Sequence, residues 1–407
     1  MERIYLDNAA TTPLDSEVRK AMEPYFSDLY GNPNSLHWFG QQARTAVDSA
    51  REMIANAIGA RFREIIFTGS ATEANNLALR GAIKKARATF EALHEGKPMK
   101  VIISSIEHDS ILDTAKDLEK EGVEVVVIPV NAYGFVDTEA LAAAIDERTV
   151  LISVMYANNE IGSIQPIKEI ANGIKTFRMR KHALPYYPLF HVDAVQAFQF
   201  LDCNVDALGV DMMTLSAHKL YGPKGTGVLY VRTMDSVTHV QDDRMYVIQP
   251  RISGGGQEFG MRSGTENVPA IVGFAKAVEL ATERRTDTAK RLTALRDACW
   301  NRLHDTYPQI VLNNPFIDGN AYLPNIINVH VPSWKGGELL IALDLKGVAV
   351  SSGSACAARA AMPSHVLKAL GFDDDRAGSS LRISFGRHTT ESDIDRLMEA
   401  LRDLVSA

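Results

Sequence analysis

Short apolar runs alternate with amphipathic stretches through residues 41–231. The runs have the length and the branched residues of buried strands, and they lie at 65–67, 101–104, 123–128, 149–154 and 190–193. Helical periodicity fills the stretches 41–58, 73–86 and 110–121. This alternation predicts an α/β fold, in which helices cover both faces of a mainly parallel sheet. Ligands of such sheets bind at the carboxyl ends of the strands.

The pattern changes after Arg262. A long helical stretch at 269–307 is followed by strand-like runs at 326–331, 348–351 and 381–385, and by helical stretches at 363–370 and 390–405. We therefore expect a large domain at 17–261 and a smaller α+β domain formed by 1–16 and 262–407. In this arrangement the short strand at 4–6 returns to the smaller domain. The polar, irregular stretches 177–188 and 233–251 are expected to be surface loops.

Composition narrows the class of protein. The chain has 407 residues, of which 46% are hydrophobic and 23% charged, as is ordinary for a globular enzyme. Its net charge of −7 argues against a general nucleic-acid binder, which would be basic. Three cysteines are too few for a disulfide framework and fit a reducing compartment. No signal peptide and no apolar stretch long enough for a bilayer is recognised, so we expect a cytoplasmic protein.

The stretch 213–232 is the first candidate for chemistry. A strand-like run (211–215) leads into Ser216, His218 and Lys219, and a Gly/Pro turn then precedes a second strand at 226–231. An amine at the end of a buried strand can be desolvated, which lowers its pKa as Schiff-base chemistry requires. The alternative is a lysine on the surface of a hairpin loop.

Two further strand ends carry polar residues. Gly69 to Glu73 joins a strand to a helix, where the first helical amides can bind a phosphate; the same residues also form a capping box. Asp193 ends another strand, and its carboxylate could pair with a pyridinium nitrogen or cap the following segment.

Three more residues have a functional and a structural interpretation. His108 could stack on a planar cofactor or transfer protons, or be merely structural. Cys356 lies among glycine, serine and alanine, which suits a thiol that travels to a substrate, although it could also pack in a turn. Arg382 interrupts an apolar strand and could bind a substrate carboxylate, or face outward.

These segments together resemble the cysteine desulfurases of the NifS/IscS type, which are fold-type I enzymes of the class-V aminotransferase-like group. The resemblance extends over nearly the whole chain and keeps the order of the family's motifs. The matching motifs are YLDNAATTP (5–13), FTGSATEANN (67–76), SSIEHDSILD (104–113), YANNEIGSIQP (156–166), HVDAVQ (191–196), SAHKLYGPKGTGVLYVR (216–232), GGGQEFGMRSGTENV (254–268), VSSGSACAAR (350–359) and LRISFGRHTTESDID (381–395).

The resemblance implies a large domain with a seven-stranded sheet and pyridoxal 5′-phosphate as the cofactor, with no metal. Lys219 is implied to hold the cofactor covalently, Asp193 to face the ring nitrogen, and His108 to stack on the ring and serve in catalysis. The other implied cofactor contacts are Ala71, Thr72, Asn159, Gln196, Ser216, His218 and, from the second subunit of a homodimer with composite sites, Thr265.

The resemblance also implies the reaction. Asn159 and Arg382 would bind the carboxylate of L-cysteine, and Cys356 would take the sulfur as a persulfide while L-alanine is released. The sulfur would pass to an acceptor protein such as an iron–sulfur scaffold, or into tRNA thiolation. A selenocysteine lyase or a transaminase of the same fold is the alternative, although a transaminase has no use for a thiol in a small-residue loop. Neither direct binding of nucleic acid nor membrane insertion is expected.

Overall fold

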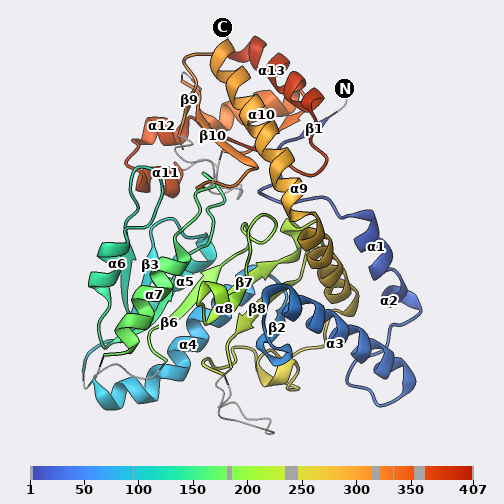
Figure 1. Cartoon of the computed structure of the whole chain (residues 1–407), viewed down its shortest axis with the longest axis vertical. Coiled ribbons are helices and arrows are strands. Elements are labelled where there is room, and N and C mark those ends of the chain that lie inside the picture. Colours follow the sequence, from blue (N-terminus) through green and yellow to red (C-terminus); the bar gives the residue numbers. More distant parts are fainter. Residues whose placement is uncertain are drawn as a thin grey trace.

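The computed structural model describes residues 3–94, 96–180, 186–233, 246–313, 321–332, 334–352 and 363–405. Figure 1 shows a broad lower body built on one sheet, a smaller upper body that contains both ends of the chain, and the long helix α9 running between them. The fold belongs to the α/β class, as the alternating pattern predicted. The division into domains at residue 262 stays a prediction.

The lower body contains a sheet that has seven strands in the described part of the chain. In spatial order they are β2 (Ile65–Thr68), β8 (Gly227–Val231), β7 (Met212–Ser216), β6 (Leu189–Asp193), β5 (Thr149–Ser153), β3 (Lys100–Ser104) and β4 (Glu124–Ile128). Neighbouring strands are parallel except at β8, which runs antiparallel to both β2 and β7. The carboxyl ends of β2, β3, β5, β6 and β7 therefore share one edge of the sheet.

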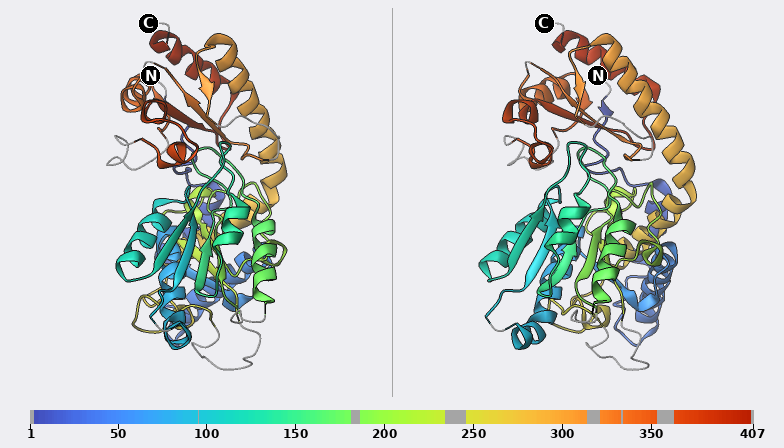
Figure 2. Two further views of the ribbon diagram at one scale, coloured as in Figure 1. Left: turned by 90° about the vertical axis from the view of Figure 1, so that its left-hand side faces the viewer. Right: turned by 60° about the vertical axis from the view of Figure 1, so that its left-hand side comes forward.

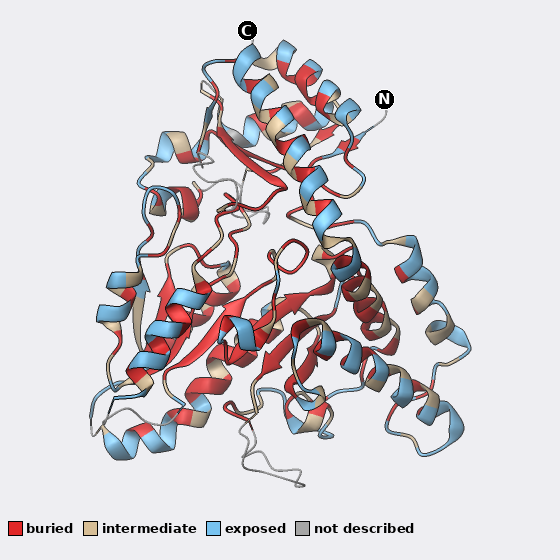
Figure 3. Ribbon diagram, in the orientation of Figure 1, coloured by how far each residue is buried: buried red, intermediate tan, exposed pale blue. Residues whose placement is uncertain are grey.

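Helices cover both faces of this sheet. Successive side chains of a strand point to opposite faces, so each strand contributes residues to both cores. On β2, Ile66 joins the core under α4 (Ala71–Leu93) and α5 (Asp109–Lys120), whereas Ile65 and Phe67 join the core on the other face. Figure 3 shows most strands of this sheet buried along their length, whereas only Ile128 is buried in the edge strand β4. The remaining helices of this body are α1 (Ser16–Met22), α2 (Pro24–Ser27), α3 (Trp38–Ile58), α6 (Thr138–Ala144), α7 (Ile167–Arg178) and α8 (Val205–Leu208), with short 3-10 turns η1 (Phe62–Glu64), η2 (Ala217–Lys219) and η4 (Glu258–Gly260).

Helix α9 (Val268–Thr306) packs against α1 and α3 and, further along, against β10 and α13 of the upper body. Figure 2 shows this helix along one side of both bodies. The upper body contains the antiparallel strands β12 (Ser380–Ser384), β10 (Ile326–His330) and β9 (Val311–Leu312). Strand β1 (Ile4–Tyr5) pairs with β11 (Val348–Ala349), so the N-terminal strand returns to the C-terminal part as predicted. The helices here are α10 (Gly336–Leu345), α11 (His365–Ala369), α12 (Asp374–Gly378) and α13 (Glu391–Val405).

The prediction of two surface loops needs correction. Phe177 is a buried residue of α7, and 181–185 and 234–245 lie outside the described residues. Residues 246–248 are buried, because this segment packs closely on α4: Gln249 N donates to Gly81 O at 3.0 Å. A Cβ at Gly81 would lie 2.7 Å from Gln249 O, so only glycine admits this contact. Short elements such as β9, α10 and α12 were not predicted either.

No helix among the described residues is both long and apolar enough to cross a membrane.

Candidate active site

A cavity of about 530 Å³ opens at the shared carboxyl edge of the sheet. Most of the residues singled out in the sequence line it, although they come from distant parts of the chain. The lining includes Ala71, Thr72, His108, Asn159, Asp193, Gln196, Ser216, His218, Lys219 and Arg382. The residues that follow strands of this sheet meet here, as the position of strand ends predicts. Arg382 instead reaches the cavity from β12 of the upper body, whose bounds are Ser380–Ser384.

Lys219 lies in the 3-10 turn η2, directly after β7. Its Nζ donates to the main-chain oxygens of Ala9 (2.5 Å) and Ala10 (2.7 Å), which belong to the N-terminal segment. Burial is the main reason why the pKa of Lys219 falls from 10.5 to about 7; Arg382 lowers it further, while Asp7 and Asp193 oppose the change. A substantial fraction of this amine is therefore neutral near pH 7. The surface-loop alternative is wrong, because Lys219 lines the cavity and donates to two main-chain oxygens there.

His218 precedes Lys219 and is also desolvated. Burial, aided by Lys219 and Lys224, lowers the pKa of its imidazole to about 4. Its Nδ1 lies 3.1 Å from Thr11 Oγ1, and its main-chain oxygen accepts from Thr12. His218 is consequently a neutral hydrogen-bonding group at physiological pH.

The turn between β2 and α4 has the geometry of an anion site. Ser70 caps α4 by accepting from Glu73 N at 3.1 Å, and Glu73 Oε2 accepts from Gly69 N at 2.9 Å. Glu73 also receives a hydrogen bond from Arg262 Nε at 2.8 Å. Strand β8 approaches so closely that a Cβ at Gly227 would lie 2.6 Å from the main-chain carbon of Ser70. The first amides of this long helix, next to the cavity, suit a phosphate.

Asp193 lies beside this turn and is buried. Its Oδ1 accepts from Val195 N at 3.0 Å and its Oδ2 accepts from Asn75 Nδ2 at 2.8 Å. No ion pair within the described residues involves Asp193, and a buried carboxylate calls for a cationic partner. His108 caps α5, and its Nδ1 accepts from Ser110 N at 3.1 Å.

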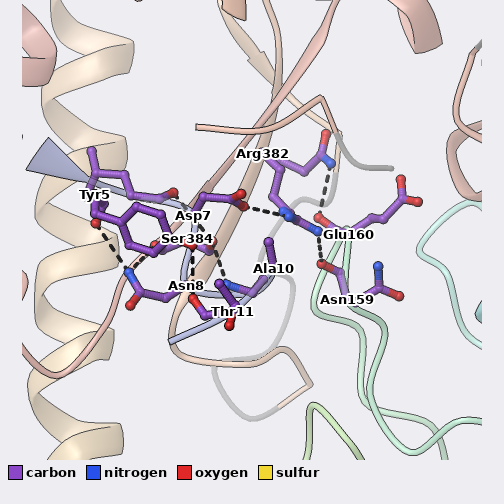
Figure 4. A network of polar contacts seen from close by, with 12 residues as sticks. Tyr5, Asp7, Asn8, Ala10, Thr11, Asn159, Glu160, Arg382 and Ser384 are labelled. Carbon is purple, nitrogen blue, oxygen red and sulfur yellow. Dashed lines mark hydrogen bonds and ion pairs between the residues drawn. The ribbon is translucent and has the colours of Figure 1, made fainter. Parts of the chain in front are cut away.

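Arg382 projects from β12 toward the same cavity and is buried, with only 1% of its side chain exposed. Its Nη2 donates to Asp7 Oδ1 at 2.7 Å and its Nη1 donates to the main-chain oxygen of Asn159 at 2.9 Å. Figure 4 shows the guanidinium between Asp7 and the 159–160 segment. The outward-facing alternative for Arg382 is wrong, because strand β12 is covered on both sides.

Sequence reasoning missed the N-terminal segment as part of the site. Ala9, Ala10 and Thr11 line the cavity, and Gln196 Nε2 donates to Ala9 O at 2.9 Å. Asn8 Nδ2 and Ala9 N anchor the segment to Ser384 of β12. The small residues of this loop were the available signal, because they let main-chain oxygens approach Lys219.

Two buried glutamates, Glu107 and Glu160, lie next to predicted residues. Glu107 Oε1 accepts from Ser104 Oγ (2.5 Å) and Met155 N (2.7 Å), and burial raises its pKa to about 8. Glu160 Oε2 accepts from Ser364 Oγ at 2.5 Å, and burial raises its pKa as well. The two glutamates are part of the motifs at 104–113 and 156–166. Nothing in the sequence indicated that their side chains are buried.

One predicted residue, Thr265, lies apart from the cavity lining. Thr265 is exposed and lines a separate cavity of about 190 Å³ together with Gly69, Gly225 and Arg262. Cys356 lies outside the described residues, so its role rests on the motif. The other cysteines, Cys203 and Cys299, are buried, and burial raises the pKa of each thiol to about 12.

Comparison with known proteins agrees with this arrangement. The aminotransferase class-V family matches residues 4–397. The chain is 42% identical over 402 residues to the cysteine desulfurase IscS of Dictyoglomus turgidum, covering 99% of this chain and 94% of that protein. It is also 42% identical over 404 residues to cysteine desulfurase IscS 1 of Archaeoglobus fulgidus, covering 98% and 96%.

Solved structures are similar over the same length. A NifS-like protein superposes with a TM-score of 0.86 at 36% identity, covering 99% of both chains. A NifS-like protein from Rickettsia africae gives a TM-score of 0.82 at 32% identity, covering 100% of both chains. The chain therefore belongs to the class-V aminotransferase family of fold-type I enzymes. Within that family it is a cysteine desulfurase, as the full-length relatives are.

Proposed function

We propose that the chain converts L-cysteine to L-alanine with pyridoxal 5′-phosphate in the 530 Å³ cavity, and that Cys356 takes the sulfur. The observation that carries the proposal is the amine of Lys219: its pKa is lowered to about 7, and it lines one cavity with a buried carboxylate and a helix N-terminus. An aldehyde, a pyridinium nitrogen and a phosphate are the groups that these three features complement.

The residues present fit this cofactor. Lys219 would hold it covalently, Asp193 would pair with the ring nitrogen, and His108 would lie against the ring. The phosphate would be held at Ala71 and Thr72 of the α4 N-terminus and by Ser216 and His218, with Thr265 contributed by a second subunit. Gln196 and Asn159 would complete the ring contacts. The hydrogen bonds from Asn75 Nδ2 and Val195 N hold the Asp193 carboxylate in place, where it would face a pyridinium nitrogen.

When bound, pyridoxal phosphate supplies an electron sink for bond cleavage next to the amino group of the substrate. The protein supplies position and protons. Arg382 and Asn159 bind the substrate carboxylate, and the neutral amine of Lys219 can take up a proton from the substrate and return it. His108 lines the same cavity and is a second proton carrier.

Cys356 supplies the nucleophile. Its thiolate forms a bond to the substrate sulfur while the carbon–sulfur bond of the substrate breaks. The electron pair of that bond stays with the carbon skeleton, which becomes alanine after protonation, and the sulfur remains on Cys356 as a persulfide. The persulfide is then delivered to an acceptor protein, for iron–sulfur assembly or thiolation, in the reducing cytoplasm.

Purified protein loaded with pyridoxal phosphate tests the proposal. With cysteine and dithiothreitol it should release alanine and sulfide in equal amounts. Selenocysteine and a keto-acid acceptor, supplied separately, distinguish the alternatives. A selenocysteine lyase would release selenide but no sulfide, and a transaminase would form a new amino acid without sulfide. Either pattern would contradict a desulfurase.

A further inference from the structure

Asn75 of α4 joins two parts of the site, although neither sequence pattern nor motif singled it out. Its side chain is 1% exposed, and Nδ2 donates to Asp193 Oδ2 and to Ser110 Oγ, both at 2.8 Å. Because a carboxylate only accepts, the amide nitrogen must face Asp193. Both hydrogens of the amide are thus used, one on each partner.

The connection continues to His108. Ser110 Oγ receives a hydrogen bond from Asn75 and lies 2.9 Å from His108 Nδ1, which also accepts from Ser110 N. Nδ1 of the neutral ring is therefore an acceptor, and its proton is on Nε2. Asp193, Asn75, Ser110 and His108 form one continuous hydrogen-bonded path.

We propose that Asn75 is a positioning residue that fixes the Asp193 carboxylate and, through Ser110, ties it to His108. This inference rests on the proposed function, since it assigns the two ends of the path to cofactor contacts. Helix α4 then has two tasks: its first turn offers amides to the phosphate, and its second turn orients the carboxylate for the ring nitrogen.

Packing alone does not explain an asparagine here. Asn75 Oδ1 is buried, and it has no hydrogen-bond partner among the described residues, which is a cost. Leucine has the same branched shape, with no polar atom, and would avoid that cost. The two hydrogen bonds donated by Nδ2 are what leucine could not supply. Without them, the remaining donor to Asp193 among the described residues is Val195 N.

The test compares Asn75→Leu and Asn75→Asp with Asn76→Ala as the matched control. Asn76 is the next residue of α4, bonds to Thr72 O and Arg80, and does not line the cavity. The measurements are the dissociation constant of pyridoxal phosphate, the kcat and KM for cysteine, and the melting temperature of the cofactor-free protein.

Asn75→Leu should raise the cofactor dissociation constant about 10-fold or more, as expected for a lost charge-assisted hydrogen bond. The kcat of this variant should fall as its cofactor affinity falls. Its KM for cysteine should change little, because Asn159 and Arg382 are untouched. The melting temperature should stay near that of the wild type.

Asn75→Asp adds a pH dependence of cofactor affinity, which a change in packing alone would not produce. Its carboxylate would face Asp193, near His108, Glu107 and Lys219, and two such carboxylates share a proton at low pH. Cofactor affinity of this variant should recover as pH falls from about 8 to about 6, whereas that of Asn75→Leu should not. The inference is overturned if Asn75→Leu binds the cofactor as the control does, or if Asn75→Asp shows no recovery.

Failure of the proposed function would look different. A wild type that binds the cofactor but releases no alanine from cysteine would refute the desulfurase activity. The cofactor affinities of the variants would still decide the role of Asn75.

Discussion

Arg382 donates to Asp7 at 2.7 Å, which joins residues 375 positions apart at the edge of the cavity. The guanidinium is buried, whereas 19% of the Asp7 side chain is exposed. Asp7 therefore provides the nearby negative charge that makes a buried cation tolerable. The pair also ties the N-terminal segment, whose carbonyls bind Lys219, to strand β12.

Replacing Asp7 with alanine should destabilise the cofactor-free protein by roughly 2–3 kcal/mol, because it leaves Arg382 buried without its carboxylate. This figure is just below the range for fully buried pairs, since water reaches Asp7. Urea unfolding measures the change. The exposed Asp28→Ala is the control and should cost less than about 0.5 kcal/mol. Equal stability of the two variants would contradict a stabilising role for the pair.

The stability of the cofactor-free protein should depend on pH through Lys219. Its pKa is about 7 in the folded protein and about 10.5 when unfolded, so between these values the unfolded chain binds more protons. Wild-type stability therefore rises with pH across this window. The gain in stability of Lys219→Met over the wild type should be largest below pH 7 and shrink toward pH 10.

Urea unfolding at several pH values checks this dependence, with Lys116→Met on the exposed face of α5 as the control. The control should differ from the wild type by a constant amount. A Lys219→Met difference that is equally constant would mean that the lysine is not desolvated in the folded protein.

The site residues at the strand ends could be predicted from the sequence. The pattern of apolar residues locates each strand, and a parallel topology brings the strand ends to one edge of the sheet. Lys219, Asp193 and His108 follow strands of one mainly parallel sheet, and such ends meet at one edge. The contacts of Ala9 and Ala10 with Lys219 could not be predicted. They span more than 200 positions and depend on how an aperiodic segment packs between two sheets. Asn75 and Asn76 are likewise indistinguishable until the helix is placed against Asp193.

Arg382→Lys should raise KM for cysteine about 10-fold while kcat changes less than about threefold. Lysine keeps the charge but lacks the planar guanidinium that donates two hydrogen bonds to one carboxylate, so substrate binding weakens. The contact is made in the ground state and in the transition state alike, so KM changes more than kcat. Arg387→Lys is a matched control, because Arg387 pairs with Asp15 away from the cavity. Steady-state kinetics distinguish the two variants, and an unchanged KM for Arg382→Lys would exclude it as the carboxylate ligand.

The proposed composite site predicts complementation between inactive variants. Lys219→Ala and Thr265→Ala, unfolded and refolded together, should regain up to about a quarter of wild-type activity, since half of the dimers are hybrids with one intact site. The double variant Lys219→Ala/Thr265→Ala, refolded together with either single variant, should gain no activity. Absence of any gain in the first mixture would contradict a Thr265 that acts across subunits.

The central claim is that Cys356 takes sulfur from cysteine. Its most direct test is alanine and sulfide production, measured together under dithiothreitol, for Cys356→Ser, Cys203→Ser and Cys299→Ser. Cys356→Ser should retain the cofactor colour and still bind cysteine, because Lys219, Asn159 and Arg382 are intact. Both products should nevertheless fall to near background, since serine is a far weaker nucleophile. The other two variants should keep the reaction, because both thiols are buried. Wild-type turnover by Cys356→Ser would contradict the persulfide mechanism.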